Sequence, residues 1–205
     1  MGIKAVVFDY GKVISLPPDP GVLERFAQLI GADLEKLEPV FWSFRDEYDR
    51  GAISAREYYK DVIRHLGASV PDDKDLDEIT MMDLNSWANI NPGTTSLMHD
   101  VKKAGYVLGI LSNMPHDFLA LYRDKLPVFS LPHVSLFSCH VNIIKPGEAI
   151  YRKLLSMLEL EPAEVVFFDD RADNIKTARD LGMEAFVWEN PEEARNVLSS
   201  LGVKV

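Results

Sequence analysis

The sequence predicts a doubly wound α/β protein with a mainly parallel sheet and an inserted helical domain. Two observations lead to this fold class. Short apolar runs that do not alternate with polar residues recur along the chain, as in strands buried on both faces of a parallel sheet. Segments with apolar residues at helical spacing separate these runs. Such alternation of strand and helix is typical of sheets built with right-handed crossovers.

The expected strands are apolar runs rich in β-branched and aromatic residues. Three of the strong runs lie in the second half of the chain, and one lies near its beginning. A fifth, weaker run covers 133–138. The strong runs cover 5–8, 106–111, 165–168 and 185–188.

Amphipathic helices are expected between these strands, over 93–104, 147–158 and 172–181. In each segment, apolar residues recur three and four positions apart, which places them on one face of a helix. Gly105 and Gly182 follow the first and third segments, where a glycine readily ends a helix. The core is therefore expected to be a Rossmann-like sheet with helices on both faces.

Residues 16–88 interrupt this alternation. The segment opens with the proline-rich linker 16–20 and then shows only helical patterns, over 21–30, 34–49 and 55–66. Ser54 and Glu57 form a capping-box pattern at the start of the last helix, and Gly67 is placed to end it. We expect 1–15 and 89–205 to form the Rossmann-like core, with 16–88 as a helical cap domain above the first strand.

The composition argues against several classes of protein. The net charge of −10 repels phosphate backbones, so nucleic acid is not an expected partner. No apolar stretch approaches the roughly 18 residues of a membrane span. Cys139 is the only cysteine, which excludes an internal disulfide and suits the cytoplasm. A catalytic role for Cys139 is disfavoured, because His140 would point to the opposite face of a strand. No feature indicates an obligate protein partner.

Four polar motifs follow the ends of the expected strands. In open α/β sheets ligands bind at the carboxyl ends of the strands, so these motifs are expected to converge although they lie far apart in the chain. They bring acidic groups, a small hydroxyl and a lysine to one edge of the sheet. The motifs are FDYGKVI at 8–14, LSN at 111–113, IKP at 144–146 and FFDDRADNI at 167–175.

In order and spacing, these four motifs resemble those of the haloacid dehalogenase (HAD) superfamily. The chain is most similar to the α-D-glucose-1-phosphatase-like branch, which itself resembles the N-terminal phosphatase domain of soluble epoxide hydrolases. The resemblance covers essentially the whole chain, including a helical insertion where the family carries its cap. It implies a magnesium-dependent phosphatase that hydrolyses a small phosphorylated metabolite through a phosphoaspartyl intermediate. A sugar phosphate, such as a sugar 1-phosphate, is the expected substrate class.

The resemblance also implies a role for each matching residue. Asp9 would be the nucleophile, and Ser112 would hydrogen-bond the transferring phosphoryl group together with the backbone amide of Asn113. Lys145 would place positive charge on the same oxygens. Asp169 would be either a secondary metal ligand or a partner that orients Lys145.

A carboxylate can attack phosphorus only if the repulsion between two anions is cancelled, and a divalent cation does this. Hard oxygen ligands suit Mg²⁺, which usually takes only one or two carboxylates from a protein. The resemblance assigns the metal to Asp9, Asp170 and the backbone carbonyl of Gly11.

Gly11 is also where the sequence departs from most phosphatases of this superfamily. These carry a second Asp two residues after the nucleophile, which protonates the leaving group. General acid catalysis contributes about 10²–10⁴-fold, so its absence favours substrates with better leaving groups, such as sugar 1-phosphates over 6-phosphates. Lys12, a cap residue or a water molecule is a candidate substitute.

Substrate choice is expected to lie in the cap. Arg45 is the candidate substrate-binding residue there, and Trp42, Tyr48 and Asp49 share its helical spacing, although a solvated helix face remains the alternative. Two other functions stay open. A 2-haloacid dehalogenase would also use Asp9 but needs neither an acid nor a metal. A catalytically weak member could bind a phosphorylated ligand without turnover.

Overall fold

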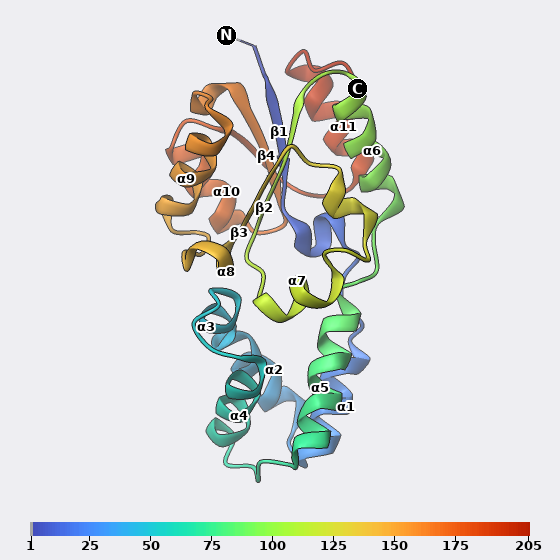
Figure 1. The fold of residues 1–205 in the computed structure, drawn as a ribbon, viewed down its shortest axis with the longest axis vertical. Coiled ribbons are helices and arrows are strands. Elements are labelled where there is room, and N and C mark those ends of the chain that lie inside the picture. The colour runs from blue at the N-terminus through green and yellow to red at the C-terminus, as the bar shows by residue number, and fades with distance from the viewer. Residues whose placement is uncertain (1) are drawn as a thin grey trace.

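A parallel five-stranded sheet is the centre of the computed structural model, which describes residues 2–205 (Figure 1). The strand order is β3-β2-β1-β4-β5, and each neighbouring pair is parallel. In the centre of the sheet, Val7 pairs with Gly109 on one side and Phe167 on the other. The doubly wound α/β prediction is therefore confirmed. The strands are β1 (Ala5–Phe8), β2 (Val107–Ser112), β3 (Val134–Phe137), β4 (Val165–Asp169) and β5 (Glu184–Val187).

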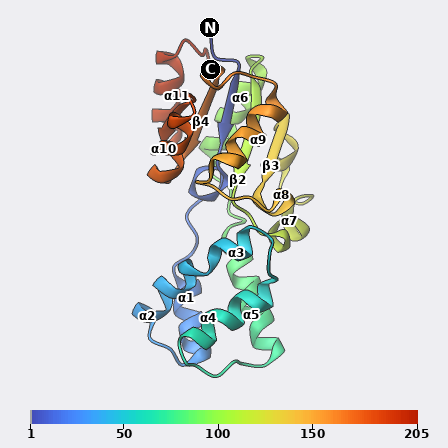
Figure 2. The same ribbon diagram turned by 90° about the vertical axis from the view of Figure 1, so that its left-hand side faces the viewer.

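Helices cover both faces of this sheet (Figures 1 and 2). Alternate residues of β1 point to opposite faces, so Val6 and Phe8 join one apolar cluster while Ala5 and Val7 join the other. The first cluster packs against α6 (Pro92–Lys103) and α11 (Pro191–Ser200), and the second against α9 (Glu148–Leu158) and α10 (Ala172–Asp180). The core also contains five shorter helical segments: η1 (Tyr10–Ile14), α7 (His116–Tyr122), η2 (Pro127–Ser130), α8 (Ser138–Val141) and η3 (Pro162–Glu164).

Five further helices lie beyond the carboxyl ends of the strands (Figure 1). They pack around an apolar cluster of their own, which includes Phe26, Phe41 and Tyr59. Residues 16–88 therefore carry a separate core, and we propose that they act as a cap domain over a core made of 1–15 and 89–205. Of these residues, only residue 1 lies outside the described part of the chain. The helices are α1 (Gly21–Ile30), α2 (Leu34–Ser43), α3 (Arg45–Asp49), α4 (Ala55–His65) and α5 (Asp73–Ser86).

The local signals in the sequence place most helix ends correctly. Ser54 and Glu57 form the expected capping box at the start of α4, with both reciprocal hydrogen bonds present. Gly67, Gly105 and Gly182 follow the predicted helices with φ between 67° and 91°, which glycine adopts without strain.

Two predictions of local structure are wrong. The expected helix over 34–49 is divided at Phe44 into α2 and α3, and Val40 O accepts there from both Ser43 Oγ at 2.9 Å and Phe44 N at 3.3 Å. In addition, β3 ends at Phe137, and Cys139 and His140 lie in the helical turn α8. The argument that these two side chains point to opposite faces of a strand does not hold.

Candidate active site

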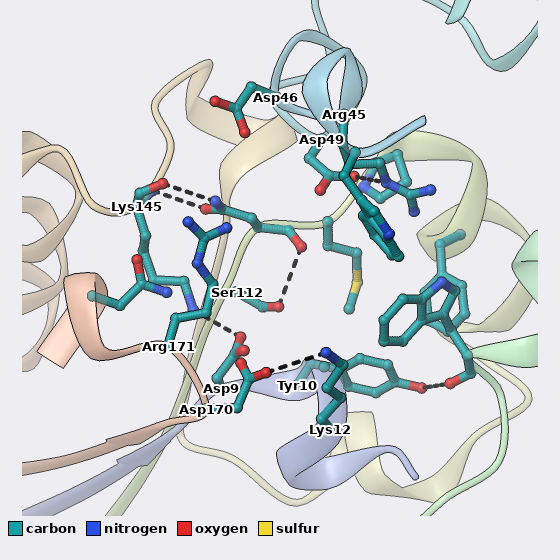
Figure 3. Close-up of a pocket in the computed structure, with 18 residues that line it drawn as sticks. Asp9, Tyr10, Lys12, Arg45, Asp46, Asp49, Ser112, Lys145, Asp170 and Arg171 are labelled. Atoms are coloured by element: carbon teal, nitrogen blue, oxygen red, sulfur yellow. Dashed lines mark hydrogen bonds and ion pairs between the residues drawn. The ribbon is translucent and has the colours of Figure 1, made fainter. Parts of the chain in front are cut away.

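A cavity of about 400 Å³ lies between the carboxyl ends of the strands and the helices of 16–88 (Figure 3). The sheet contributes the residues that follow β1, β2 and β4, and the helical segment contributes Trp42, Arg45 and Trp87. Apart from Asp169, which is fully buried, the catalytic, substrate-binding and metal-binding residues expected from the sequence line this cavity: Asp9, Gly11, Arg45, Ser112, Asn113, Lys145 and Asp170.

A buried ion cluster forms the floor of the cavity. Lys145 Nζ lies 2.8 Å from Asp9 Oδ1 and 2.5 Å from Asp169 Oδ2, and it also donates to Leu111 O at 3.1 Å. The Lys145 side chain is 2% exposed, and those of Asp9 and Asp169 are 9% and 0% exposed. One buried cation therefore neutralises only one of two buried carboxylates, and the cluster keeps an excess negative charge.

Asn113 fixes the backbone of Lys145. Its side-chain nitrogen donates to Lys145 O at 3.0 Å, and its side-chain oxygen accepts from Lys145 N at 2.8 Å (Figure 3). The end of β2 is thereby tied to the loop that carries the lysine. Because the carboxamide of Asn113 is committed to Lys145, the backbone amide remains the group that Asn113 can offer to a substrate.

Asp169 has a full set of hydrogen-bond donors. Its Oδ1 accepts from Arg171 N at 2.9 Å and from Asn174 Nδ2 at 2.8 Å, while its Oδ2 faces Lys145. Of the two roles that the sequence left open for Asp169, this geometry favours the orientation of Lys145 over metal ligation.

Asp170 is the more accessible of the paired carboxylates, with its side chain 25% exposed. Lys12 Nζ lies 3.7 Å from Asp170 Oδ2 across the cavity mouth (Figure 3). Lys12 reaches this position from η1, where it adopts φ 58°, a left-handed conformation unusual for lysine. This lysine therefore stands beside the carboxylate expected to hold a metal.

Burial and crowding shift the pKa values in the floor. Burial raises the pKa of Asp9 to about 7; Lys145 opposes this rise, and Asp169 adds to it. Burial lowers the pKa of Lys145, but the carboxylates of Asp169 and Asp9 outweigh it and raise the value above the ordinary one. Burial and Asp169 also raise the pKa of Asp170. Burial is thus the largest cause of the raised pKa of both Asp9 and Asp170, whereas the nearby carboxylates raise the pKa of Lys145.

The residues in the floor suit a magnesium ion. One oxygen from each of Asp9, Asp169 and Asp170 lies within 4.8 Å of the others. Within residues 2–205, Asp9 Oδ1 is buried and accepts no well-aligned hydrogen bond, although it lies in ion-pair range of Lys145. Hard oxygen donors with one open lone pair and excess negative charge are what Mg²⁺ prefers.

Gly11 lies against Trp87 rather than in open space. A Cβ atom at position 11 would lie 3.5 Å from Trp87 Cζ3 and 3.9 Å from Asp9 Oδ2, both ordinary contacts. The backbone of Gly11 has φ −64°, which any residue adopts. The absence of a side chain at this position is therefore not imposed by the local backbone or by a clash at Cβ.

Arg45 lines the cavity, but its charged head is already paired. Its Nε lies 2.9 Å from Asp49 Oδ1 and its Nη1 lies 2.7 Å from Asp83 Oδ2. Asp83 also accepts from Tyr59 OH at 2.8 Å and from Trp87 Nε1 at 3.2 Å. Arg45 thus joins α3 to α5 and, through Asp83, orients Trp87. Only the N–H groups of Arg45 that are not used in these ion pairs could bind a substrate.

Sequence reasoning missed Asp83 and Trp87. Asp83 lies in α5 and Trp87 directly follows that helix, which the sequence analysis did not predict. In addition, an acidic residue within a helix gives no sign in the sequence that its side chain is buried. Tyr48, which shares the helical spacing of Arg45, packs into the apolar cluster of residues 16–88 and does not line the cavity. His116, which lies after the end of β2, is exposed and does not line the cavity.

Comparison with known proteins gives a consistent picture. Residues 3–182 match the family model of the haloacid dehalogenase-like hydrolases. The bifunctional epoxide hydrolase 2 of Rattus norvegicus is 28% identical over 221 residues, covering 98% of this chain and 39% of the rat protein. The D-ribitol-5-phosphate phosphatase of Bacteroides thetaiotaomicron is 25% identical over 214 residues, covering 96% of this chain and 97% of that protein. The chain thus spans about two fifths of the length of the mammalian epoxide hydrolases it matches.

Solved structures share the fold. A HAD family enzyme of Bacteroides thetaiotaomicron, in complex with magnesium and inorganic phosphate, has a TM-score of 0.70 at 22% identity and covers 92% of this chain and 96% of its own. An L-2-haloacid dehalogenase has a TM-score of 0.68 at 21% identity and covers 91% of this chain and 86% of its own. At these identities the likeness shows the fold alone. Among residues 2–205, no helix has both the length and the apolar character needed to cross a membrane.

Proposed function

The chain belongs to the haloacid dehalogenase-like hydrolases, and on that premise we propose that it is a magnesium-dependent phosphatase of a small phosphorylated metabolite. The observation that carries this proposal is the buried group of Asp9, Lys145 and Asp169 on the cavity floor, with Asp170 beside it. The sole cysteine keeps the cytoplasm as the proposed compartment.

Asp9, Asp170 and the carbonyl of Gly11 would hold Mg²⁺, which supplies positive charge that offsets the repulsion between carboxylate and phosphate. An oxygen of Asp9 forms a bond to phosphorus while the bond from phosphorus to the leaving oxygen breaks. Lys145 and Ser112, both buried beside Asp9, direct a cation and a hydroxyl donor toward the phosphoryl oxygens. This step leaves the phosphoryl group on Asp9.

Water then attacks the phosphorus of the phosphoaspartyl group, which releases inorganic phosphate and restores the Asp9 carboxylate. Residue 11 cannot accept the proton of this water or donate one to the leaving oxygen, because glycine has no side chain. Lys12, which reaches Asp170, is a candidate for part of this role. The chemistry therefore favours leaving groups that need little protonation.

We propose a sugar phosphate, such as a sugar 1-phosphate, as the substrate class. Trp42 and Trp87 line the cavity with ring centroids 6.5 Å apart, and they supply aromatic surface for a small organic body. Asp46 and Asp49 supply acceptors for hydroxyl groups. The relative named for D-ribitol 5-phosphate supports a sugar-type phosphate as the class.

A screen of phosphorylated metabolites with Mg²⁺ tests the proposal, with Asp9→Asn as the inactive control. We expect phosphate release that stops in the control and in EDTA, with a higher kcat/KM for a sugar 1-phosphate than for the matching 6-phosphate. Equal kcat/KM values would refute the leaving-group argument while leaving the phosphatase proposal intact.

The two alternatives give different results in the same screen. The solved dehalogenase shares the fold, and a 2-haloacid dehalogenase would release halide from a 2-haloacid in the presence of EDTA. A ligand-binding member would retain a stable phosphoaspartyl group at Asp9 with negligible steady-state turnover. The crowded carboxylates on the cavity floor favour a metal-dependent site over the dehalogenase, and steady-state turnover separates the phosphatase from the ligand-binding member.

A further inference from the structure

A second cluster of metal-ligating side chains lies outside the cavity. His116 is the first residue of α7, and Cys139 and His140 lie in α8. One ligand atom from each of the three residues lies within 4.8 Å of the others. The two imidazole rings have centroids 6.0 Å apart. None of these side chains lines the cavity that holds Asp9.

The donor set differs in kind from that of the cavity floor. Two imidazoles and one thiolate suit a borderline-soft ion such as Zn²⁺, whereas the carboxylates beside Asp9 suit Mg²⁺. Bond lengths of about 2.1 Å to nitrogen and 2.3 Å to sulfur place tetrahedral zinc ligands about 3.5 Å apart. A separation within 4.8 Å therefore needs side-chain movements of only about 1 Å.

The backbone around the cluster is fixed by Ser138. Its hydroxyl accepts from Met114 N at 2.8 Å and donates to Asp49 O at 2.5 Å. These bonds tie the start of α8 to the segment that leads into α7, and both to the end of α3. The three ligating residues are thus carried on two segments that are already joined, so binding an ion would order little backbone.

Gly51 closes the cluster from the side of the helical segment. A Cβ atom at position 51 would lie 2.8 Å from His116 Nε2 and Cδ2, and 3.0 Å from the Cβ of Cys139. The backbone of Gly51, with φ 78°, thus packs directly on two of the ligating residues. This close contact makes the cluster part of the junction between residues 16–88 and the sheet.

We propose that His116, Cys139 and His140 form a binding site for a zinc-type divalent ion, with the fourth position left to water. The ion would join α7 to α8 at the junction with residues 16–88. The buried thiol, 2% exposed, supplies the ligand that selects zinc over magnesium, and the two exposed histidines give the ion access from solvent.

Cobalt spectroscopy tests this proposal with a signature that the catalytic carboxylates cannot give. Cys139 is the only cysteine, so a thiolate-to-cobalt charge-transfer band can come from no other residue. Adding Co²⁺ to the metal-free protein is expected to produce this band with tetrahedral d–d bands at one equivalent. One equivalent of Zn²⁺ should remove them by displacement.

Three ligand variants and two controls complete the experiment. Cys139→Ser should abolish the charge-transfer band, and His116→Gln or His140→Gln should weaken Zn²⁺ binding about tenfold or more. His99→Gln, an exposed histidine of α6, should change neither. Asp170→Asn, which removes a carboxylate of the cavity floor, should leave the band intact.

The proposal is overturned if wild-type protein gives no thiolate band with excess Co²⁺. It is equally overturned if the band survives unchanged in the His116→Gln, His140→Gln double variant, since Cys139 alone would then bind the ion. Circular dichroism shows whether each variant folds. Failure of this experiment leaves the phosphatase proposal untouched, because the two sites share no residue.

Discussion

Replacing the proposed nucleophile is expected to stabilise the metal-free protein while abolishing its activity. In the Asp9→Asn variant the buried floor loses one of two carboxylates that share a single lysine. Asparagine keeps the shape and polarity of the side chain but carries no charge. The unfavourable burial of charge at Asp9 is therefore removed, together with the group that would attack phosphorus.

The magnitude follows from the pKa of Asp9, which burial raises from 3.8 to about 7. A shift of this size corresponds to about 4 kcal/mol as an upper limit, at roughly 1.4 kcal/mol per pKa unit. The value of about 7 already includes the opposing contact with the Lys145 ammonium, so that contact is not subtracted again. The gain in the free energy of unfolding is therefore at most about 4 kcal/mol, which corresponds to a rise in Tm of up to about 8–16 °C.

The sign of this effect depends on pH. Folded protein binds a proton at Asp9 that the unfolded chain has released, so the stability contributed by Asp9 is complete below pH 4 and is lost as the pH rises through 7. The variant has no such loss. The difference in the free energy of unfolding between variant and wild type should therefore grow from about pH 4 to pH 7 and then level off.

Urea unfolding in EDTA, at pH 4.5 and pH 8, measures this difference directly. The matched control is Asp173→Asn, because the pKa of that exposed carboxyl is lowered by its hydrogen bond with Arg171. Its removal should slightly destabilise the protein at pH 8, by less than about 1 kcal/mol. The reasoning fails if Asp9→Asn is no more stable than wild type at pH 8, or if its gain is the same at both pH values.

Three further changes give distinct outcomes. Lys145→Met leaves the carboxylates of the floor without their cation, so activity should fall to background and metal-free stability should drop by about 3–5 kcal/mol in urea unfolding at pH 8. Gly11→Asp adds a side chain whose Cβ meets only ordinary contacts, and it should raise kcat on a sugar 6-phosphate by up to about 10²-fold relative to the 1-phosphate. Asp83→Ala removes both the charge that pairs with Arg45 and the oxygen that accepts from Trp87, so stability should fall by about 2–4 kcal/mol and KM should rise as Trp87 loses its hydrogen bond, both measured on the purified variant.

The sheet and the residues at its edge were predictable because their signals are local and mutually consistent. A continuous apolar run such as Val165–Phe168 has few alternatives to a buried strand, and strand polarity then fixes where Asp169 and Asp170 emerge. The same rule brings Ser112, the last residue of β2, beside Asp9 without any knowledge of tertiary contacts. Lys145 follows the helical turn α8 rather than a strand, so its position was predicted by the family resemblance and not by this rule. Glycines after helices, such as Gly105, also predicted where the helices end, because glycine is the residue that most readily adopts the left-handed conformation found there.

The contacts between segments were not predictable, since they depend on side chains whose burial the sequence does not reveal. Asn113 holds Lys145 through two hydrogen bonds, yet an asparagine after a strand usually reads as a turn residue. Asp83 is charged and lies within a helix, so its burial with Arg45 emerges only when α3 and α5 pack together. The proximity of His116 to Cys139 likewise depends on where β3 ends.

The space beside Gly11 bears on the absence of an acidic side chain at this position in the proposed reaction. An aspartate at this position is not excluded by the backbone, and its Cβ would be accommodated beside Trp87. Trp87 is itself fixed through Asp83 to Arg45, so the helical segment supplies the surface that lies over position 11. A side chain extending from position 11 would compete with a substrate for the space beside that ring. In the proposed reaction, glycine at position 11 would give up proton transfer and leave the ring of Trp87 open to the substrate next to Asp9. This would benefit only substrates whose leaving oxygen needs little protonation.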